Sequence, residues 1–253
     1  MRKSRGHASQ NSRTSPAGKP VCNSILASIP DSEFLLIRPY LEFCNLPRLQ
    51  ILHEPNEKLK FAYFLNSGLV SVMIETKEGK TVEVGTIGVD GIVGIGAAGG
   101  LAKSTLRELV QISGDGFRIK ISALQSLLRS APMLRVILDR CTVLQYLQVA
   151  QTAACNRLHN VEQRFARWLL TLQARSDSDS LAITHDFLAA ILGTDRPSVS
   201  LAAGNFQRRE IIKYTRGTVR ILNRKKLEKL ACECFAIIEQ FNFAPAQFQS
   251  QQS

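Results

Sequence analysis

The side chains best suited to chemistry gather in one stretch near the C-terminus, and that chemistry is the binding of a polyanion. From Leu181 to Lys225 there are eight basic residues against three acidic ones. The basic residues are Arg196, Arg208, Arg209, Lys213, Arg216, Arg220, Arg224 and Lys225. The whole chain of 253 residues is also basic, with a formal net charge of +11. Positive charge concentrated in this way is typical of a surface that meets a phosphate backbone.

The same stretch has the pattern of a helix-turn-helix. Thr184 and Asp195 are of the residue types that cap helix N-termini, so they predict two short helices. Gly193 lies between them and tolerates the positive φ that a sharp turn needs. Ala189, Gly193 and Val199 have the offsets of a small residue at the helix crossing, a turn glycine and an apolar anchor.

A basic hairpin follows the two predicted helices. Its strands are Ile211–Tyr214 and Val219–Leu222, and Gly217 lies in the turn between them. A basic hairpin placed after a helix-turn-helix is a wing. The stretch therefore predicts a winged helix-turn-helix that binds double-stranded DNA, and the alternative is the same module used for protein contacts.

Other patterns that carry chemistry in other proteins do not assemble into a site here. Gly94–Gly99 reads G-x-G-x-x-G, but that fingerprint must open a helix inside a βαβ unit, and this stretch is followed by Gly100 and then another strand. Cys232 and Cys234 are predicted on one helix with their thiols pointing in different directions, which favours packing over metal binding. A redox role for Cys141 or Cys155 across a dimer interface is a further hypothesis. The four histidines are too dispersed for a metal site or a triad. We therefore expect no enzyme activity, no catalytic residue, no metal site and no cofactor.

The elements that must position the predicted DNA-binding module come before it. From Leu46 to about Ile121, short apolar runs alternate with turns, which predicts an all-β barrel or sandwich. Pro132 to Leu158 has no glycine and no internal proline, which predicts one long helix. The fold class expected is α+β.

No apolar run approaches the roughly 20 residues of a membrane-spanning helix, and the N-terminus lacks the apolar region of a secretory signal. We therefore expect a cytoplasmic protein with no membrane partner.

The predicted long helix has two apolar stripes. One recurs at alternating steps of four and three residues, the spacing of a heptad seam, and we assign it to a dimer interface. This stripe comprises Ile137, Cys141, Leu144, Gln148, Gln151 and Cys155. The second stripe comprises Val136, Val143, Leu147, Ala150 and Ala154. A helix with two such faces can pack on its own domain with one and on a twin helix with the other; the alternative is a helix buried wholly in its own subunit.

With barrel, long helix and winged helix in this order, the chain resembles the Crp/Fnr family of bacterial transcription regulators from about Asn23 to Phe241. The most telling stretches are Cys155–Arg164, Arg196–Gly204 and Ala231–Phe235, which look like the linker, recognition helix and C-terminal helix of one branch of the family. The resemblance implies a cupin-like effector barrel, a homodimer through the long helix and DNA sites of twofold symmetry. It also implies RNA polymerase as a partner.

The resemblance carries roles for individual residues in DNA binding. Arg196 falls at the base-reading arginine position of the family, and its guanidinium suits bidentate bonding to guanine. Pro197 replaces the acidic residue of many members, which implies a different target sequence. Ser200 and Leu201 occupy the next exposed turn and are expected to touch bases. The residues expected to hold phosphates are Thr194, Ser198, Arg216 and Arg220.

The effector is the part that the resemblance leaves open. Members that bind cyclic nucleotides carry a Gly-Glu pair and an Arg-Ser pair, whereas the matching stretches here are Gly94-Ile95 and Ser104-Thr105. Without the arginine a buried phosphate lacks its counter-charge, so we do not expect cyclic AMP to bind. Cys22 and Cys44 are too isolated for the N-terminal iron–sulfur cluster of other members. An unknown small molecule remains a candidate partner.

These observations predict a sequence-specific transcription regulator. The expected units are a disordered basic tail (1–21), an effector-sensing domain (22–131), a dimerisation helix and hinge (132–159), a DNA-binding domain (160–243) and a disordered C-terminal tail (244–253). One alternative is a constitutive regulator whose barrel is only a scaffold for dimerisation and polymerase contact. The other is a small-molecule-binding signalling subunit with no DNA role.

Overall fold

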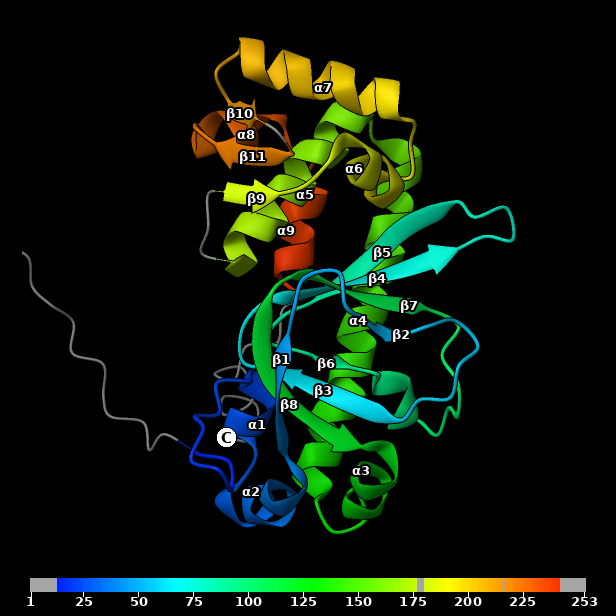
Figure 1. Ribbon diagram of the computed structural model, residues 1–253, viewed down its shortest axis with the longest axis vertical. Helices are drawn as coiled ribbons and strands as arrows, with labels where there is room; N and C mark the ends of the chain where they lie inside the picture. The colour runs from blue at the N-terminus through cyan, green and yellow to red at the C-terminus, as the bar shows by residue number, and fades with distance from the viewer. Residues whose placement is uncertain (1–12, 177–179, 216, 242–253) are drawn as a thin grey trace, which may run out of the picture.

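The computed structural model describes residues 13–176, 180–215 and 217–241. A β-barrel occupies the middle of the molecule, and the long helix α4 (Pro132–Leu158) runs along it (Figure 1). A smaller domain of helices and a three-stranded sheet lies at one end, and α1 to α3 lie at the other (Figure 1). The predicted α+β class, with barrel, long helix and C-terminal helix-turn-helix in that order, is confirmed. Within the described residues, no helix combines the length and the apolar character needed to cross a bilayer.

Prolines and a side-chain cap divide the N-terminal helical stretch into short pieces. The Asn23 side chain accepts hydrogen bonds from two backbone N–H groups and so starts α1 (Ser24–Ser28). Pro30 precedes α2 (Asp31–Ile37), since proline at a helix start removes no helical hydrogen bond. A 3₁₀ helix, Arg38–Tyr40, then leads into the first strand.

The predicted N-terminal tail is corrected in part. The guanidinium of Arg13 donates hydrogen bonds to the backbone oxygens of Leu26 and Ile29, at 2.5 and 2.6 Å. Residues 13–21 therefore belong to the folded body. Their basic, serine-rich composition hid this, because the partners that order them are carbonyl groups at the end of α1. Residues 1–12 and the predicted C-terminal tail lie outside the described residues.

Two four-stranded antiparallel sheets form the barrel, in the orders β1-β8-β3-β6 and β2-β7-β4-β5. The strands are β1 (Glu42–Leu46), β2 (Ile51–His53), β3 (Phe61–Leu65), β4 (Leu69–Glu75), β5 (Thr81–Ile87), β6 (Ile92–Val93), β7 (Arg107–Ile112) and β8 (Gly114–Lys120). The G-x-G-x-x-G stretch forms a 3₁₀ turn, Ile95–Ala97, directly after β6 and not the first turn of a βαβ helix. The rejection of a dinucleotide site is consistent with this geometry.

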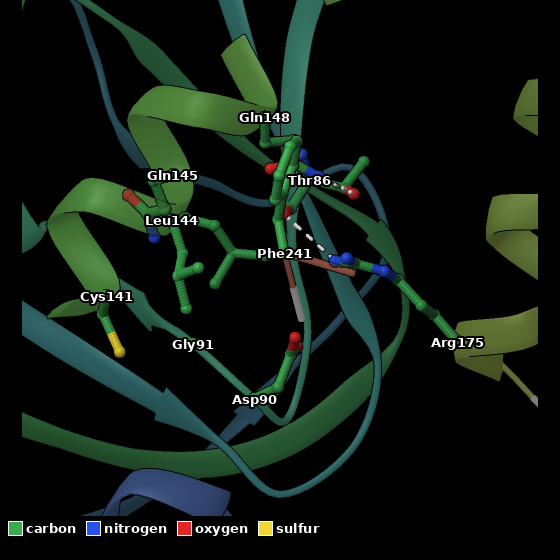
Figure 2. A pocket seen from close by; sticks show the side chains of 10 residues that line it. Thr86, Asp90, Gly91, Cys141, Leu144, Gln145, Gln148, Arg175 and Phe241 are labelled. Atoms are coloured by element: carbon green, nitrogen blue, oxygen red, sulfur yellow. Dashed lines mark hydrogen bonds between the residues drawn. The ribbon is translucent and has the colours of Figure 1, made fainter. Parts of the chain in front are cut away.

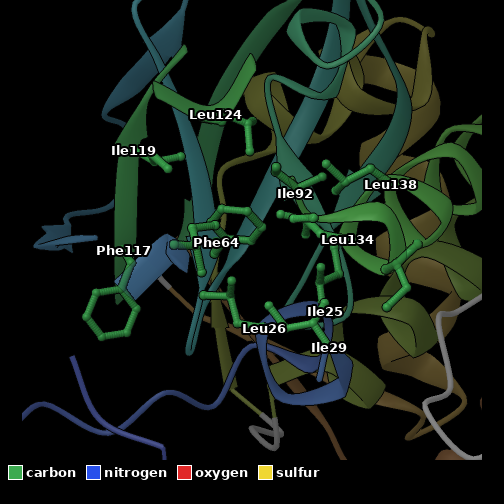
Figure 3. Close-up of a cluster of buried hydrophobic side chains, with 14 of the residues drawn as sticks. Ile25, Leu26, Ile29, Phe64, Ile92, Phe117, Ile119, Leu124, Leu134 and Leu138 are labelled. Atoms are coloured by element: carbon green, nitrogen blue, oxygen red, sulfur yellow. The ribbon is translucent and has the colours of Figure 1, made fainter. Parts of the chain in front are cut away.

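The barrel core is shared between strands and helices. Leu26 of α1, Phe64 of β3 and Ile92 of β6 pack with Leu134 and Leu138 of α4, and all five are fully buried (Figure 3). Helix α3 (Ile121–Leu127) covers the end of the same cluster. Burial of one such side chain contributes about 1.5–3 kcal/mol to stability. One face of α4 is therefore an integral part of the barrel core.

This packing corrects the predicted dimer seam. The heptad stripe assigned to a partner helix faces the interior of its own chain instead. Ile137, Cys141, Gln148 and Cys155 are buried, Leu144 packs against the barrel core, and Gln151 donates to the sulfur of Cys234. The hypothesis that Cys141 or Cys155 has a redox role across a dimer seam is also wrong, because both cysteines are buried within their own chain. Heptad spacing identifies an apolar seam, but it does not say which neighbour covers that seam.

The second stripe of α4 is the one that faces solvent. Its members are Val136, Val143, Leu147, Ala150 and Ala154. Val136 and Val143 are 51% and 56% exposed, and Tyr146 beside them is 69% exposed. The residues of this stripe are seven, four, three and four positions apart, which is also heptad spacing. A continuous exposed apolar face on a long helix is a surface suited to a second helix.

The C-terminal domain begins with the predicted capping box. The backbone N–H of Gln163 donates to the Asn160 side chain at 3.0 Å, and the backbone N–H of Asn160 donates to the Gln163 side chain at 3.1 Å. The elements that follow are α5 (Val161–Ser176), β9 (Ser180–Ala182), α6 (His185–Leu192), α7 (Arg196–Arg208), β10 (Ile212–Thr215), β11 (Thr218–Ile221), α8 (Arg224–Leu230) and α9 (Cys234–Glu239). Cys232 lies in the turn before α9 and not on the same helix as Cys234, which corrects the predicted placement of the pair.

Candidate nucleic-acid interface

Helices α6 and α7 form the helix-turn-helix. Thr184 caps α6 by accepting from the backbone N–H of Phe187 at 3.2 Å, and Asp195 caps α7 by accepting from the backbone N–H of Ser198 at 2.8 Å. Gly193 ends α6 with a φ of +58°, the left-handed conformation that glycine adopts without strain. Every local signal read from the sequence in this turn is confirmed.

An apolar inner face fixes the orientation of α7. Val199, Ala202, Ala203 and Phe206 are buried, and the ring of Phe206 stacks on Phe165 of α5 with centroids 5.2 Å apart. Because this face is buried against the rest of the domain, the opposite face of α7 points outward. In Figure 1 that helix forms the outer edge of the domain, away from the barrel.

The outward face carries three of the four predicted base-reading residues. Arg196 and Pro197 are exposed, and Leu201 is 65% exposed. An exposed leucine on such a helix can contact a thymine methyl group in a major groove. The guanidinium of Arg196 lies 3.5 Å from the carboxylate of Asp186, and both side chains are exposed. Such a surface pair is weak, so Arg196 can exchange Asp186 for a base edge at little cost.

Ser200, the fourth predicted base-reading residue, is half-buried. Its hydroxyl lies 2.9 Å from Nδ1 of His185, at the start of α6. His185 also packs on the ring of Tyr214 at 4.4 Å, and burial, together with the charge of Arg196, lowers the pKa of this histidine. His185 thus positions α7 against α6 and the wing. The sequence analysis did not single it out, and the signal for it was its place at the first position of α6, directly after the Thr184 cap.

Two of the predicted phosphate-binding residues lie at the entry to α7. The Ser198 hydroxyl donates to the Asp195 carboxylate at 2.9 Å, and the two hydrogen bonds from Ser198 lower the pKa of Asp195. The backbone N–H of Thr194 donates to the backbone oxygen of Ala189 at 3.0 Å. Both residues are half-buried, so their contribution to a DNA contact is confined to the edge of the helix start.

The wing is a hairpin of β10 and β11, and β11 also pairs with β9. In its register Lys213 lies directly opposite Arg220, and both side chains are exposed. Like charges directly opposite each other across a strand pair destabilise it, and a bound anion removes that cost. The charge of the pair is therefore suited to binding a phosphate group. Arg216, the other predicted wing contact, lies outside the described residues.

The wing pair gives a testable prediction. Replacing Arg220 with alanine should weaken binding to specific and random DNA alike, and should lower the slope of log affinity against log salt concentration by about one. Fluorescence anisotropy titrations over a range of salt concentrations measure this slope. Lys77→Ala, an exposed lysine between β4 and β5, is the control and should leave the slope unchanged. An unaltered slope in Arg220→Ala would remove this residue from the interface.

Comparison with known proteins agrees with the geometry. Residues 163–230 match the model of the Crp-like helix-turn-helix domain. A transcriptional regulator of the Crp/Fnr family from Eubacterium rectale is similar in structure, with a TM-score of 0.67 and 19% identity over 80% of this chain and 94% of that chain. FixK2 from Bradyrhizobium japonicum gives a TM-score of 0.64 and 15% identity over 76% of this chain and 98% of that chain. The c-di-GMP responsive global regulator CLP from Xanthomonas campestris gives a TM-score of 0.65 and 16% identity over 77% of this chain and 100% of that chain. No curated protein matches the chain at a significant level.

The chain has the Crp/Fnr fold and contains a Crp-like helix-turn-helix domain. This confirms the resemblance on which the sequence analysis relied. A Crp-like helix-turn-helix is a DNA-binding module and not a catalytic one, which supports the expectation that the protein is no enzyme.

In this Crp/Fnr fold the DNA-binding domain rests on strand β5 of the barrel. The indole N–H of Trp168 in α5 donates to the Glu83 carboxylate at 3.1 Å, and Glu83 also accepts from the Ser71 hydroxyl at 2.5 Å. Gly193 packs closely against β5, since a Cβ at this position would lie 2.9 Å from Val82. Burial raises the pKa of Glu83 to about 7, and its hydrogen bonds and two nearby arginines only partly offset this.

A small cavity lies between the long helix of the Crp/Fnr fold and the barrel, beside their direct contacts (Figure 2). Its volume is ≈ 30 Å³, and its lining includes Thr86, Gln148 and Arg175. The guanidinium of Arg175 donates to the Thr86 backbone oxygen at 3.1 Å, and Gln148 bonds to Thr86 from α4. Small-molecule sites usually have about 300–1,000 Å³, so this cavity does not accommodate a nucleotide. A larger surface hollow of ≈ 630 Å³ lies elsewhere on the barrel, beside Lys58, Lys60 and Lys120.

Proposed function

We propose that the protein is a sequence-specific transcription regulator that binds a twofold-symmetric DNA site as a homodimer. The observation that carries this proposal is the outward face of α7, where Arg196 and Leu201 are exposed beside a basic wing. A helix placed in this way presents one hydrogen-bonding and one apolar side chain to a major groove. The fold of the chain and its Crp-like helix-turn-helix domain support the same function.

The exposed stripe of α4 is the dimer interface in this proposal. Val136, Val143 and Leu147 pack against the same residues of a second copy, as in a parallel coiled coil. A twofold axis there brings two α7 helices to one side of the assembly. The two helices then enter successive major grooves about 34 Å apart.

The roles of the interface residues follow from this placement. Arg196, Pro197 and Leu201 read bases, and Ser200 does so from a position that His185 holds. Phosphates are held by Thr194, Ser198, Arg216 and Arg220. The functional units are the effector barrel (22–131, joined by residues 13–21), the dimerisation helix and hinge (132–159) and the DNA-binding domain (160–243). Because the partner is chromosomal DNA, we place the protein in the cytoplasm, with RNA polymerase and an unidentified small molecule as further partners.

The base-reading role of Arg196 is tested by substitution. Arg196→Ala should cost about 1–3 kcal/mol of binding free energy on the specific site and little on random DNA. Arg118→Ala is the control and should change neither affinity, because Arg118 is a partly exposed arginine of the barrel strand β8 and is paired with Glu42. Gel-shift titrations on both DNA types measure these affinities. Equal losses on the two DNA types would assign Arg196 to the backbone and overturn its base-reading role.

The function itself is tested by selecting genomic DNA fragments on the purified protein. A twofold-symmetric motif that is enriched by the wild type and lost in Arg196→Ala is the expected result. The selection is repeated with cell extract added, since an effector is then supplied. Failure to enrich any motif under either condition would contradict the proposal and favour a signalling subunit without a DNA role.

A further inference from the structure

Four potential metal ligands converge where the long helix meets the DNA-binding domain. Cys155 and His159 lie one turn apart at the end of α4, Cys232 lies in the turn before α9, and Cys234 is the first residue of α9. Their ligand atoms, three sulfurs and one ring nitrogen, all lie within 4.8 Å of one another. The three cysteines are buried, and the side chain of His159 is 14% exposed. All six cysteines of the chain have free thiols.

The distances within the cluster match those of a tetrahedral metal site. Zinc binds sulfur at about 2.3 Å and nitrogen at about 2.0–2.1 Å, so a tetrahedron has edges of about 3.8 Å between sulfurs and 3.6 Å between sulfur and nitrogen. Here the sulfurs of Cys155 and Cys232 are 3.5 Å apart, and the Cys234 sulfur is 3.6 Å from Nδ1 of His159. These two distances are those of tetrahedral edges, and the other ligand atoms, all within 4.8 Å of one another, need only small side-chain movements to reach the same geometry.

The surroundings of His159 are those of a metal-bound histidine. Its Nδ1 faces the sulfurs, while its Nε2 lies 3.3 Å from the carboxylate of Glu233. A carboxylate on the far ring nitrogen fixes the tautomer and strengthens the ligand in many metal sites. The amide of Gln151 donates to the Cys234 sulfur at 3.1 Å, as second-sphere donors do to thiolates.

Buried positive charge lies beside the cluster. Three thiolates and one divalent ion leave a net charge of −1, which is costly in an apolar interior without a counter-charge. Arg164 and Arg167 of α5 are both buried and interact electrostatically with Cys155. The Nε atoms of both arginines have no hydrogen-bond partner within the described residues. Arg164 also donates to the Leu192 backbone oxygen at 2.7 Å, and Arg167 also faces Glu83. An anionic metal site would give both guanidinium groups a nearby counter-charge.

We propose that Cys155, His159, Cys232 and Cys234 form a tetrahedral site for one zinc ion. The set of three sulfurs and one imidazole is typical of structural zinc, and four protein ligands leave no open position for catalysis. The site fastens the C-terminal end of α4 to α9 across the hinge between barrel and DNA-binding domain. The binding of zinc does not depend on the DNA-binding proposal, so either can fail without the other.

The sequence predicted no metal site here because the position of Cys232 relative to α9 was not predicted correctly. Cys232 and Cys234 were placed on one helix, where their thiols diverge. Because Cys232 instead lies in the turn before α9, both sulfurs point to the end of α4. A spacing of C-x-x-x-H followed far along the chain by C-x-C was the available signal.

The first test is the metal content of the full-length protein, prepared without an affinity tag and under reducing conditions. After loading with zinc and desalting, mass spectrometry of the elements should find about one zinc ion per chain. Replacement by Co²⁺ should produce the absorption of tetrahedral, thiolate-bound cobalt. Both measurements use the wild type, so the result does not depend on whether a variant folds. Less than about a tenth of an equivalent of zinc after loading would overturn the proposal.

Variants then assign the ligands. The triple variant Cys155→Ser/Cys232→Ser/Cys234→Ser should lose the zinc, whereas the control Cys22→Ser/Cys44→Ser should retain it. Glu233→Gln keeps all four ligands and should weaken zinc affinity by about 10- to 100-fold. Zinc retained by the triple variant, or lost equally by the control, would overturn the assignment. A Cys155–Cys232 disulfide without zinc in protein isolated from cells would also overturn it, in favour of a thiol switch.

Discussion

Replacing Val143 with glutamate should weaken binding to a twofold-symmetric DNA site by about 10²- to 10⁴-fold, while the chain itself stays folded. Val143 is 56% exposed in the middle of the outer stripe of α4, and it has no partner within the described chain that the change would remove. In the proposed dimer, two glutamates would face each other in an apolar seam. The cost of burying them separates the protomers, and the second helix-turn-helix then no longer binds as part of the same molecule.

Two measurements together test this expectation. Analytical ultracentrifugation should show a dimer for the wild type and a monomer for Val143→Glu, and gel-shift titration should show the matching loss of affinity. Leu35→Glu is the matched control, because Leu35 is an exposed helical leucine of α2 with 64% exposure. It should remain dimeric and bind DNA as the wild type does. A dimeric Val143→Glu protein would contradict the assignment of the outer stripe to the interface.

Glu83 should make the stability of the protein fall as pH rises from 4.5 to about 7. Its pKa is near 4.5 in an unfolded chain and about 7 in the folded protein, mainly because it is buried. Below pH 4.5 both states hold the proton and there is no penalty. Between the two values the unfolded chain releases the proton while the folded protein keeps it, which favours unfolding. Above pH 7 the folded protein contains a buried carboxylate, and the full cost of about 3 kcal/mol is present.

The charged groups that face Glu83 are on α5. Arg167 and Arg175 both favour the ionised form, but they do not outweigh burial. Replacing Glu83 with glutamine removes the titration and retains both contacts, since its oxygen can accept from Trp168 and its amide can donate to Ser71. Glu83→Gln should therefore be more stable than the wild type at pH 8, by about 3 kcal/mol, with a much smaller difference at pH 5.

Urea unfolding of both proteins at pH 5 and pH 8 measures this difference. Glu78→Gln changes an exposed glutamate in the turn between β4 and β5, and it should alter neither curve. A Glu83→Gln protein that is less stable than the wild type at pH 8 would show that the ionised carboxylate contributes to the contact between barrel and DNA-binding domain. That outcome would contradict the expected sign.

The DNA-binding module was predictable because its signals are local. The caps at Thr184 and Asp195, the turn at Gly193 and the hairpin around Gly217 each depend on a few neighbouring residues. Backbone sterics and short-range hydrogen bonds decide such features, and both can be read from residue types in order. The capping box of Asn160 and Gln163 is predictable for the same reason.

The long helix shows where local information ends. Both stripes of α4 have apolar residues at heptad steps, and the sequence analysis assigned the wrong one to the partner. The choice between them depends on which face the barrel covers, and that is determined by the pairing of strands as distant as β1 and β8. Side chains of one face, such as Leu134 and Leu138, then become barrel core.

The sequence by itself determined the order of the units, the helix-turn-helix with its wing and the concentration of positive charge on it. Only the tertiary structure decided which face of α4 is free, that Glu83 is buried under Trp168, and that four ligands from α4 and α9 meet at the hinge. The physical reason is distance along the chain: caps and turns act over a few residues, whereas these three features join residues 75 or more positions apart or depend on what such contacts bury.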